Sequence, residues 1–167
     1  MAEDLVDGRR AEPAFVLPER EMLEAWLEFH RTTLLLKCDG LNDEQRKARP
    51  VETSNLSLHG LVRHMAEVER NWFRRVLLVE PVEPIWYDPA VADSELVPLD
   101  ADDLAAWTAE CEAARQTAER HELDDTGARH GKPCSLRWIY NHMIEEYARR
   151  NGHADLIREL LDGTVGC

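Results

Sequence analysis

Residues 135–163 read SLRWIYNHMIEEYARRNGHADLIRELLDG and carry the longest helical pattern of the chain. Ser135 has a side-chain oxygen that can cap a helix N-terminus, and Gly163 is the residue type that most often follows a helix C-terminus. Arg150 lies on the apolar face between them, at a position that the pattern marks as interior. The other members of this face recur every three or four residues, namely Leu136, Ile139, Met143, Tyr147, Ala154, Ile157 and Leu161.

Three further segments show the same apolar spacing, and none alternates as a strand does. The sequence therefore predicts an all-α fold, a four-helix bundle with a long loop between its second and third helices. Pro18 suits the first turn of the first helix, because its missing N–H would be unsatisfied there anyway. The expected segments are helices from Pro18 to Asp39, from Ser54 or Ser57 to Val76 and over about 100–121, a short helical turn over 42–48, and loops over 80–99 and 127–133.

Size and charge limit what the chain can be. It has 167 residues, which is enough for one substantial core, so we expect a single domain over 18–167 after a loosely ordered N-terminal segment, 1–17. Lys and Arg total 20 against 33 Asp and Glu, a formal net charge of −13. Because affinity for nucleic acids comes largely from basic residues that neutralise phosphates, we expect no nucleic-acid partner.

The expected compartment follows from the cysteines and from the N-terminal residues. Four cysteines lie far apart and form no C-x-x-C pair, which is typical of free thiols in a reducing environment. The first residues are acidic, unlike a secretory signal, and the apolar runs are too short to span a membrane. We therefore expect a cytoplasmic protein without a membrane partner.

Ionisable residues border the apolar face of the last helix. His142 and Glu146 are four residues apart, so both can reach one ion, whereas His153 is seven residues beyond Glu146 and is a weaker candidate. His64 lies at the edge of the apolar arc of the second helix and could supply a third ligand. The alternatives are a partly buried, hydrogen-bonded imidazole and a surface His–Glu contact, and for His30 packing is the expected role.

Glu69 falls inside the apolar arc of the second helix, three residues before Trp72. A buried carboxylate needs a positive partner or hydrogen-bond donors. The sequence suggests a structural role, with a basic group such as Arg137 near the start of the last helix as the partner.

Two blocks of sequence resemble a known family. The stretch LVRHMAEVERNWF over 61–73, with SLRW over 135–138 and HMIEEYARRNGHADL over 142–156, resembles an actinobacterial branch of the DinB/YfiT-like helical-bundle superfamily. The resemblance covers about residues 18–163. It implies a four-helix bundle, often a homodimer, and in many members a divalent metal held by three side chains. Some members are thiol-dependent transferases or isomerases that use mycothiol, bacillithiol or glutathione.

The resemblance carries one ligand onto His64 and a second onto Glu146, but the third position holds Arg150. An arginine stays protonated and has no acceptor, so it cannot bind a metal. Two outcomes stay open. Either zinc or nickel is held by a shifted set, His64, His142 and Glu146, or an ion pair between Glu146 and Arg150 replaces the metal.

Two functions correspond to these outcomes. In the first, the metal lowers the pKa of a low-molecular-weight thiol, whose thiolate attacks a small electrophilic substrate. Arg150, Trp72, Tyr147 and the 80–99 loop would then contact the thiol or the substrate. In the second, the chain is a non-catalytic, stress-related or small-molecule-binding bundle whose metal site is lost.

Overall fold

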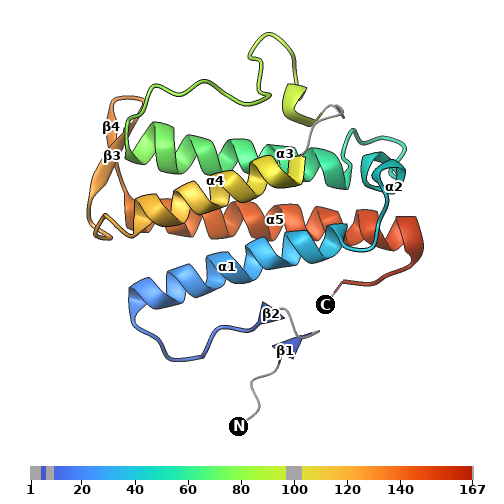
Figure 1. Ribbon diagram of the computed structural model, residues 1–167, viewed down its shortest axis with the longest axis horizontal. Helices are drawn as coiled ribbons and strands as arrows, with labels where there is room; N and C mark the ends of the chain where they lie inside the picture. Colours follow the sequence, from blue (N-terminus) through green and yellow to red (C-terminus); the bar gives the residue numbers. More distant parts are fainter. Residues whose placement is uncertain (1–4, 7–9, 97–102, 167) are drawn as a thin grey trace.

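The computed structural model describes residues 5–6, 10–96 and 103–166, and this part of the chain is mostly helical (Figure 1). The all-α class is thus confirmed. The helices are α1 (Glu19–Cys38), α2 (Asp43–Lys47), α3 (Leu58–Glu69), the π-helix η1 (Arg70–Leu77), the 3₁₀ turn η2 (Ser94–Leu96), α4 (Asp103–Ala118) and α5 (Leu136–Asp162). The strands are β1 (Leu5–Val6), β2 (Arg10–Ala11), β3 (Thr126–Arg129) and β4 (Lys132–Ser135).

The long helices pack in pairs around an apolar core (Figure 1). Helix α1 lies along α5, α3 lies along α4, and α3 also contacts α5. The apolar faces predicted from the spacing meet between these helices, and Leu34, Met65, Ile139 and Met143 are fully buried there. None of the helices in the described ranges is long and apolar enough to cross a membrane.

The ends of the helices follow local capping rules. Ser57, one of the two expected caps, accepts a hydrogen bond from the N–H of Gly60, and Ser135 accepts one from the N–H of Trp138. Pro18 precedes α1, and Gly163 ends α5 with a φ of 79°, the left-handed conformation that glycine adopts without strain. The expected start of the third long helix, at about residue 100, lies in 97–102, outside the described residues; α4 is described from Asp103.

Near the pocket, the sequence prediction lacks the π-helix η1 and the β3–β4 hairpin. The expected second helix continues as η1, a π-helix, in which each backbone hydrogen bond joins residues five apart instead of the four of an α-helix. The segment expected as a loop before α5 is instead a hairpin, in which Thr126 pairs with Ser135 and Arg129 with Lys132. These strands are short and contain Pro133, so they lack the alternating pattern that identifies a strand.

The hairpin is fixed against η1 by a glycine. A Cβ on Gly127 would lie 1.9 Å from the carbonyl oxygen of Val76, so a side chain at this position would collide with the backbone of η1. Only a residue without Cβ allows the two backbones to approach so closely. This contact places β3 beside the second half of the α3–η1 rod.

The N-terminal segment contacts α1 where it is described. Strands β1 and β2 form an antiparallel pair. Arg10 is buried and donates to Oγ1 of Thr33 at 2.6 Å, and its guanidinium lies over the ring of Phe29. The division into a loosely ordered segment, 1–17, and a domain from 18 onward stays a prediction.

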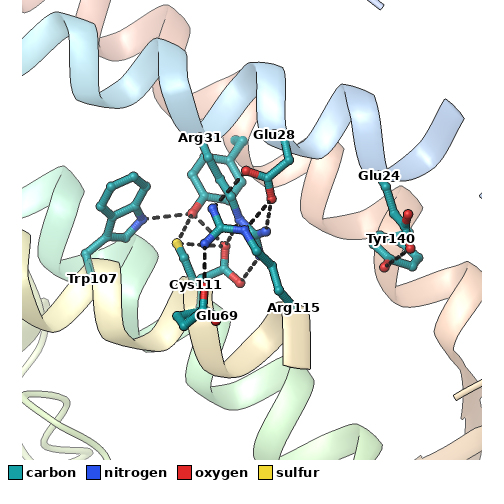
Figure 2. A network of polar contacts seen from close by, with 10 residues as sticks. Glu24, Glu28, Arg31, Glu69, Trp107, Cys111, Arg115 and Tyr140 are labelled. Carbon is teal, nitrogen blue, oxygen red and sulfur yellow. Dashed lines mark hydrogen bonds and ion pairs between the residues drawn. The ribbon is translucent and has the colours of Figure 1, made fainter. Parts of the chain in front are cut away.

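A network of charged and polar groups crosses the core (Figure 2). Arg31 of α1 holds the carboxylate of Glu69 with two hydrogen bonds, Nε to Oε1 at 2.8 Å and Nη2 to Oε2 at 2.6 Å. Both side chains are almost completely buried. The structural role expected for Glu69 thus has Arg31 as its partner, and the suggested partner was wrong, because Arg137 lies at the surface and pairs with Glu19 and Asp124.

Candidate functional site

A pocket of about 430 Å³ opens beside the α3–η1 rod and α5. Three groups of residues form it, from α3–η1, from the segment that follows η1, and from α5 with the hairpin. Its lining comprises His64, Glu67, Val68, Asn71, Trp72, Arg75, Pro84, Tyr87, Glu95, Arg129, His142 and Glu146.

One face of the α3–η1 rod supplies half of the pocket. His64, Val68, Asn71, Trp72 and Arg75 follow one another at three- or four-residue intervals or as direct neighbours, so they project toward the same side. Trp72 packs into the core and is only 4 % exposed. The rod therefore gives the pocket an apolar floor at Trp72, with polar groups at either end.

The segment after η1 is held to this face by Glu67. Its Oε1 accepts hydrogen bonds from the backbone N–H groups of Trp86 and Tyr87, the second at 2.9 Å. Arg63 stacks below the ring of Trp86, with its guanidinium carbon 4.6 Å from the ring centroid. The pocket wall at Tyr87 is thus attached to α3 by side-chain contacts rather than by secondary structure.

His142 of α5 stands among aromatic rings. Its imidazole stacks on Trp138 with 4.9 Å between centroids and an angle of 14°, and it meets the ring of Trp72 at 4.5 Å. Its Nε2 lies 3.7 Å from Oε1 of Glu146, too far for a hydrogen bond. Burial lowers the pKa of His142 below its ordinary value, so the imidazole is neutral at neutral pH.

Arg150 joins His64 to Glu146. Its Nη2 lies 3.0 Å from Nε2 of His64 and 3.2 Å from Oε2 of Glu146, while those two atoms are 3.9 Å apart. A guanidinium can only donate, so Nε2 of His64 is the acceptor and Nδ1 carries the proton. That proton points to Oε1 of Glu95, 3.3 Å away. Burial, and then the charge of Arg150, lower the pKa of His64 and keep it neutral.

The donor set does not fit a divalent ion in this arrangement. Oε2 of Glu146 is buried without a hydrogen bond in the described part of the chain, as an oxygen in a cation site would be. However, a metal bound at about 2 Å to this oxygen and to His64 would lie against the nitrogen of Arg150 and its positive charge. A second group, His142, Glu145 and Glu146, has ligand atoms within 4.8 Å of one another, but it lies on one helix and is partly exposed.

The sequence candidates fall into two places. His64, Trp72, His142 and Glu146 line one pocket, with Arg150 directly behind His64 and Glu146. Tyr147 lies apart from them in the core, where its hydroxyl donates to Glu69 at 2.7 Å and accepts from Nε1 of Trp107 at 2.9 Å.

Three charged pocket residues outside the 80–99 loop escape the sequence analysis, namely Glu67, Arg75 and Arg129. Arg75 lies eleven residues after His64, which is three helical turns, so its place on the same face could have been found from spacing. Arg129 reaches the pocket from the hairpin. No spacing rule connects the hairpin to α3.

Comparison with known proteins gives one family. The model of the family described as mycothiol-S-transferase matches residues 22–163, which includes α1 to α5 except the first residues of α1. No curated protein matches the chain.

Proposed function

We propose, from the premise that this chain belongs to the mycothiol-S-transferase family, that it joins a mycothiol-type thiol to a small electrophilic substrate in the pocket beside His64, Trp72 and His142. The family match over most of the chain carries the proposal. The geometry supports it in one respect: the pocket is large enough for a small molecule and combines an aromatic floor with polar groups.

In the proposed reaction the thiol gives up its proton, and its sulfur forms a bond with an electrophilic carbon. With a halide as the leaving group, the carbon–halogen bond breaks and the halide departs. His142 is the proton acceptor in this scheme, because its imidazole is neutral and its Nε2 forms no hydrogen bond with Glu146. Trp72 and Trp138 hold the ring in place from two sides.

Arg150 takes the position between His64 and Glu146 in this proposal, so no step passes through a metal. The guanidinium neutralises Glu146 and fixes the tautomer of His64. The metal set His64, His142 and Glu146, with zinc or nickel as the ion, remains a testable prediction, and it requires Arg150 to move away. Metal content after purification without added metal, together with a chelator titration, decides between the two arrangements.

Finer aspects of the architecture belong to the same proposal. We infer a four-helix bundle of α1, α3–η1, α4 and α5 with the long 80–99 loop, supported by the pairing of α1 with α5 and of α3 with α4. We also propose a cytoplasmic homodimer. The family resemblance supports the homodimer. The free cysteines Cys38, Cys111 and Cys134 support a reducing compartment such as the cytoplasm. Light scattering of the purified protein tests the dimer.

A second candidate is a small-molecule-binding protein without catalysis. The contact of Arg150 with both His64 and Glu146 favours this candidate, because the guanidinium occupies the ligand atoms that a catalytic metal ion would need.

The deciding experiment measures conjugation of mycothiol to 1-chloro-2,4-dinitrobenzene, with glutathione as the comparison thiol and with or without a chelator. We expect turnover with mycothiol that survives chelation and falls by about 100-fold or more in His142→Gln. That loss should shrink at high pH, where the thiol ionises without a base. Binding of mycothiol without turnover would support the second candidate, and activity that depends on zinc or nickel would restore the metal prediction.

A further inference from the structure

The acidic residues of the pocket are all engaged within the protein. Glu67 accepts two backbone N–H groups, Glu95 accepts from His64, and Glu146 faces the guanidinium of Arg150. Each of these carboxylates therefore already has a polar or charged partner within the protein.

The two arginines of the pocket differ from them. Among the described residues, Arg75 and Arg129 form no ion pair, and the one contact of Arg129 with a neighbouring group is with the ring of Trp72, 4.2 Å from its guanidinium carbon. Their neighbours on η1 behave otherwise, since Arg70 and Arg74 both pair with Glu110. Both side chains are exposed at the pocket, so their guanidinium groups are accessible to an anion from solution.

The fold places these two arginines on adjoining elements that line the pocket. Arg75 lies on η1 and Arg129 at the end of β3, and the close contact of Gly127 with Val76 ties the two elements together. A second pocket of about 410 Å³ adjoins the first. It shares Arg129, contains His130 and Lys132, and has no acidic residue in its lining.

The positive charge of Arg129 reaches the neighbouring side chains. Burial raises the pKa of Cys134, and Arg129 opposes that rise. Arg129 also contributes to the lowered pKa of His142, after the larger effect of burial. Arg129 thus adds positive potential near the hairpin, although burial is the larger effect at both side chains.

We propose that Arg75 and Arg129 bind an anionic group, a carboxylate in the simplest case, on the electrophilic substrate. Guanidinium groups hold carboxylates through charge-assisted and often paired hydrogen bonds. The apolar part of the substrate then lies along Val68 and Tyr87, and its reactive carbon lies toward His142. This inference rests on the proposed S-transfer function and adds the substrate class: small organic acids with an electrophilic carbon.

The test uses benzoate as the probe and benzamide as its uncharged counterpart, titrated calorimetrically into the full chain without thiol. We expect benzoate to bind about tenfold or more tightly than benzamide, and its affinity to weaken as salt is added. Arg75→Gln and Arg129→Gln should each weaken benzoate by about tenfold and leave benzamide unchanged. Arg120→Gln, which removes an exposed arginine outside both pockets, is the matched control and should change neither.

Equal affinity for the two probes, absence of benzoate binding, or unchanged benzoate binding in both pocket variants would overturn the proposal. Thermal unfolding of each variant confirms that it is folded. The titration contains no thiol, so a failure of the S-transfer assay would leave the benzoate result intact. Conversely, conjugation of mycothiol could be demonstrated in a protein that does not distinguish benzoate from benzamide.

Discussion

Replacing Glu69 with glutamine should destabilise the protein more than any surface change. Glu69 has a fully buried side chain, and it faces Arg31, whose side chain is 4 % exposed. Glutamine keeps the volume but removes the negative charge, so the guanidinium of Arg31 stays in the core with Glu28 as its remaining ionic contact. Breaking one side of a buried pair costs about 3–5 kcal/mol.

A further hydrogen bond ends on the same carboxylate. Oε1 of Glu69 also accepts the hydroxyl of Tyr147 at 2.7 Å. Burial, and then the charge of Glu69, raise the pKa of Tyr147 well above its ordinary value, so this hydroxyl keeps its proton and donates. At about 2–4 °C per kcal/mol for a chain of this length, the midpoint of thermal unfolding should fall by about 6–20 °C.

Urea unfolding followed by circular dichroism measures the change in free energy. Glu145→Gln is the control, because Glu145 pairs with the exposed Arg149 and should cost about 0.3–0.5 kcal/mol. The double change Glu69→Leu with Arg31→Met should be less harmful than Glu69→Gln, since it leaves no unpaired buried charge. A loss below about 1 kcal/mol for Glu69→Gln would refute this account of the core.

Three further changes test other parts of the structure. Burial alone would raise the pKa of Glu28, but a hydrogen bond from Arg115 and the charge of Arg31 hold this pKa below the ordinary 4.5. The carboxylate therefore stabilises the folded protein at neutral pH, and this stabilisation is lost as the pH falls below 4.5. The difference in urea midpoint between Glu28→Gln and the unchanged protein should accordingly be full at neutral pH and vanish below pH 4.5. Arg150→His removes the guanidinium and adds an imidazole, so zinc content after dialysis should rise to about one ion per chain, and equal zinc in both proteins would contradict the role given to Arg150. Gly127→Ala should lower the free energy of unfolding by about 1–3 kcal/mol, because the added Cβ collides with the backbone of Val76. An unchanged urea midpoint would mean that the hairpin can shift away from η1 without loss of stability.

The sequence predicted only part of the candidate site. His64 and Trp72 share a face of the second predicted helix, and His142 and Glu146 share a face of the last, so two half-sites follow from spacing. That they line one pocket depends on how α3 packs against α5. Their roles in binding or catalysis remain predictions.

The charged residues show the limit most clearly. Arg150 was recognised as an interior charge with two possible roles, and the structure places its guanidinium between Glu146 and His64. The contact with Glu146 spans four residues, whereas the contact with His64 spans 86. The second could not be derived from periodicity, and the partner of Glu69 was assigned incorrectly for the same reason.

By itself, the sequence determined where the long helices lie and how several of them end, as at Ser57, Ser135 and Gly163. These features depend on contacts within one or two turns, so the local order of residues contains them. Only the tertiary structure decided which charges meet, such as Arg31 with Glu69, and which arginines reach the pocket, such as Arg129. Those outcomes depend on distances between helices that are remote in the chain, and an arginine can satisfy its charge equally well with any carboxylate that packing brings near.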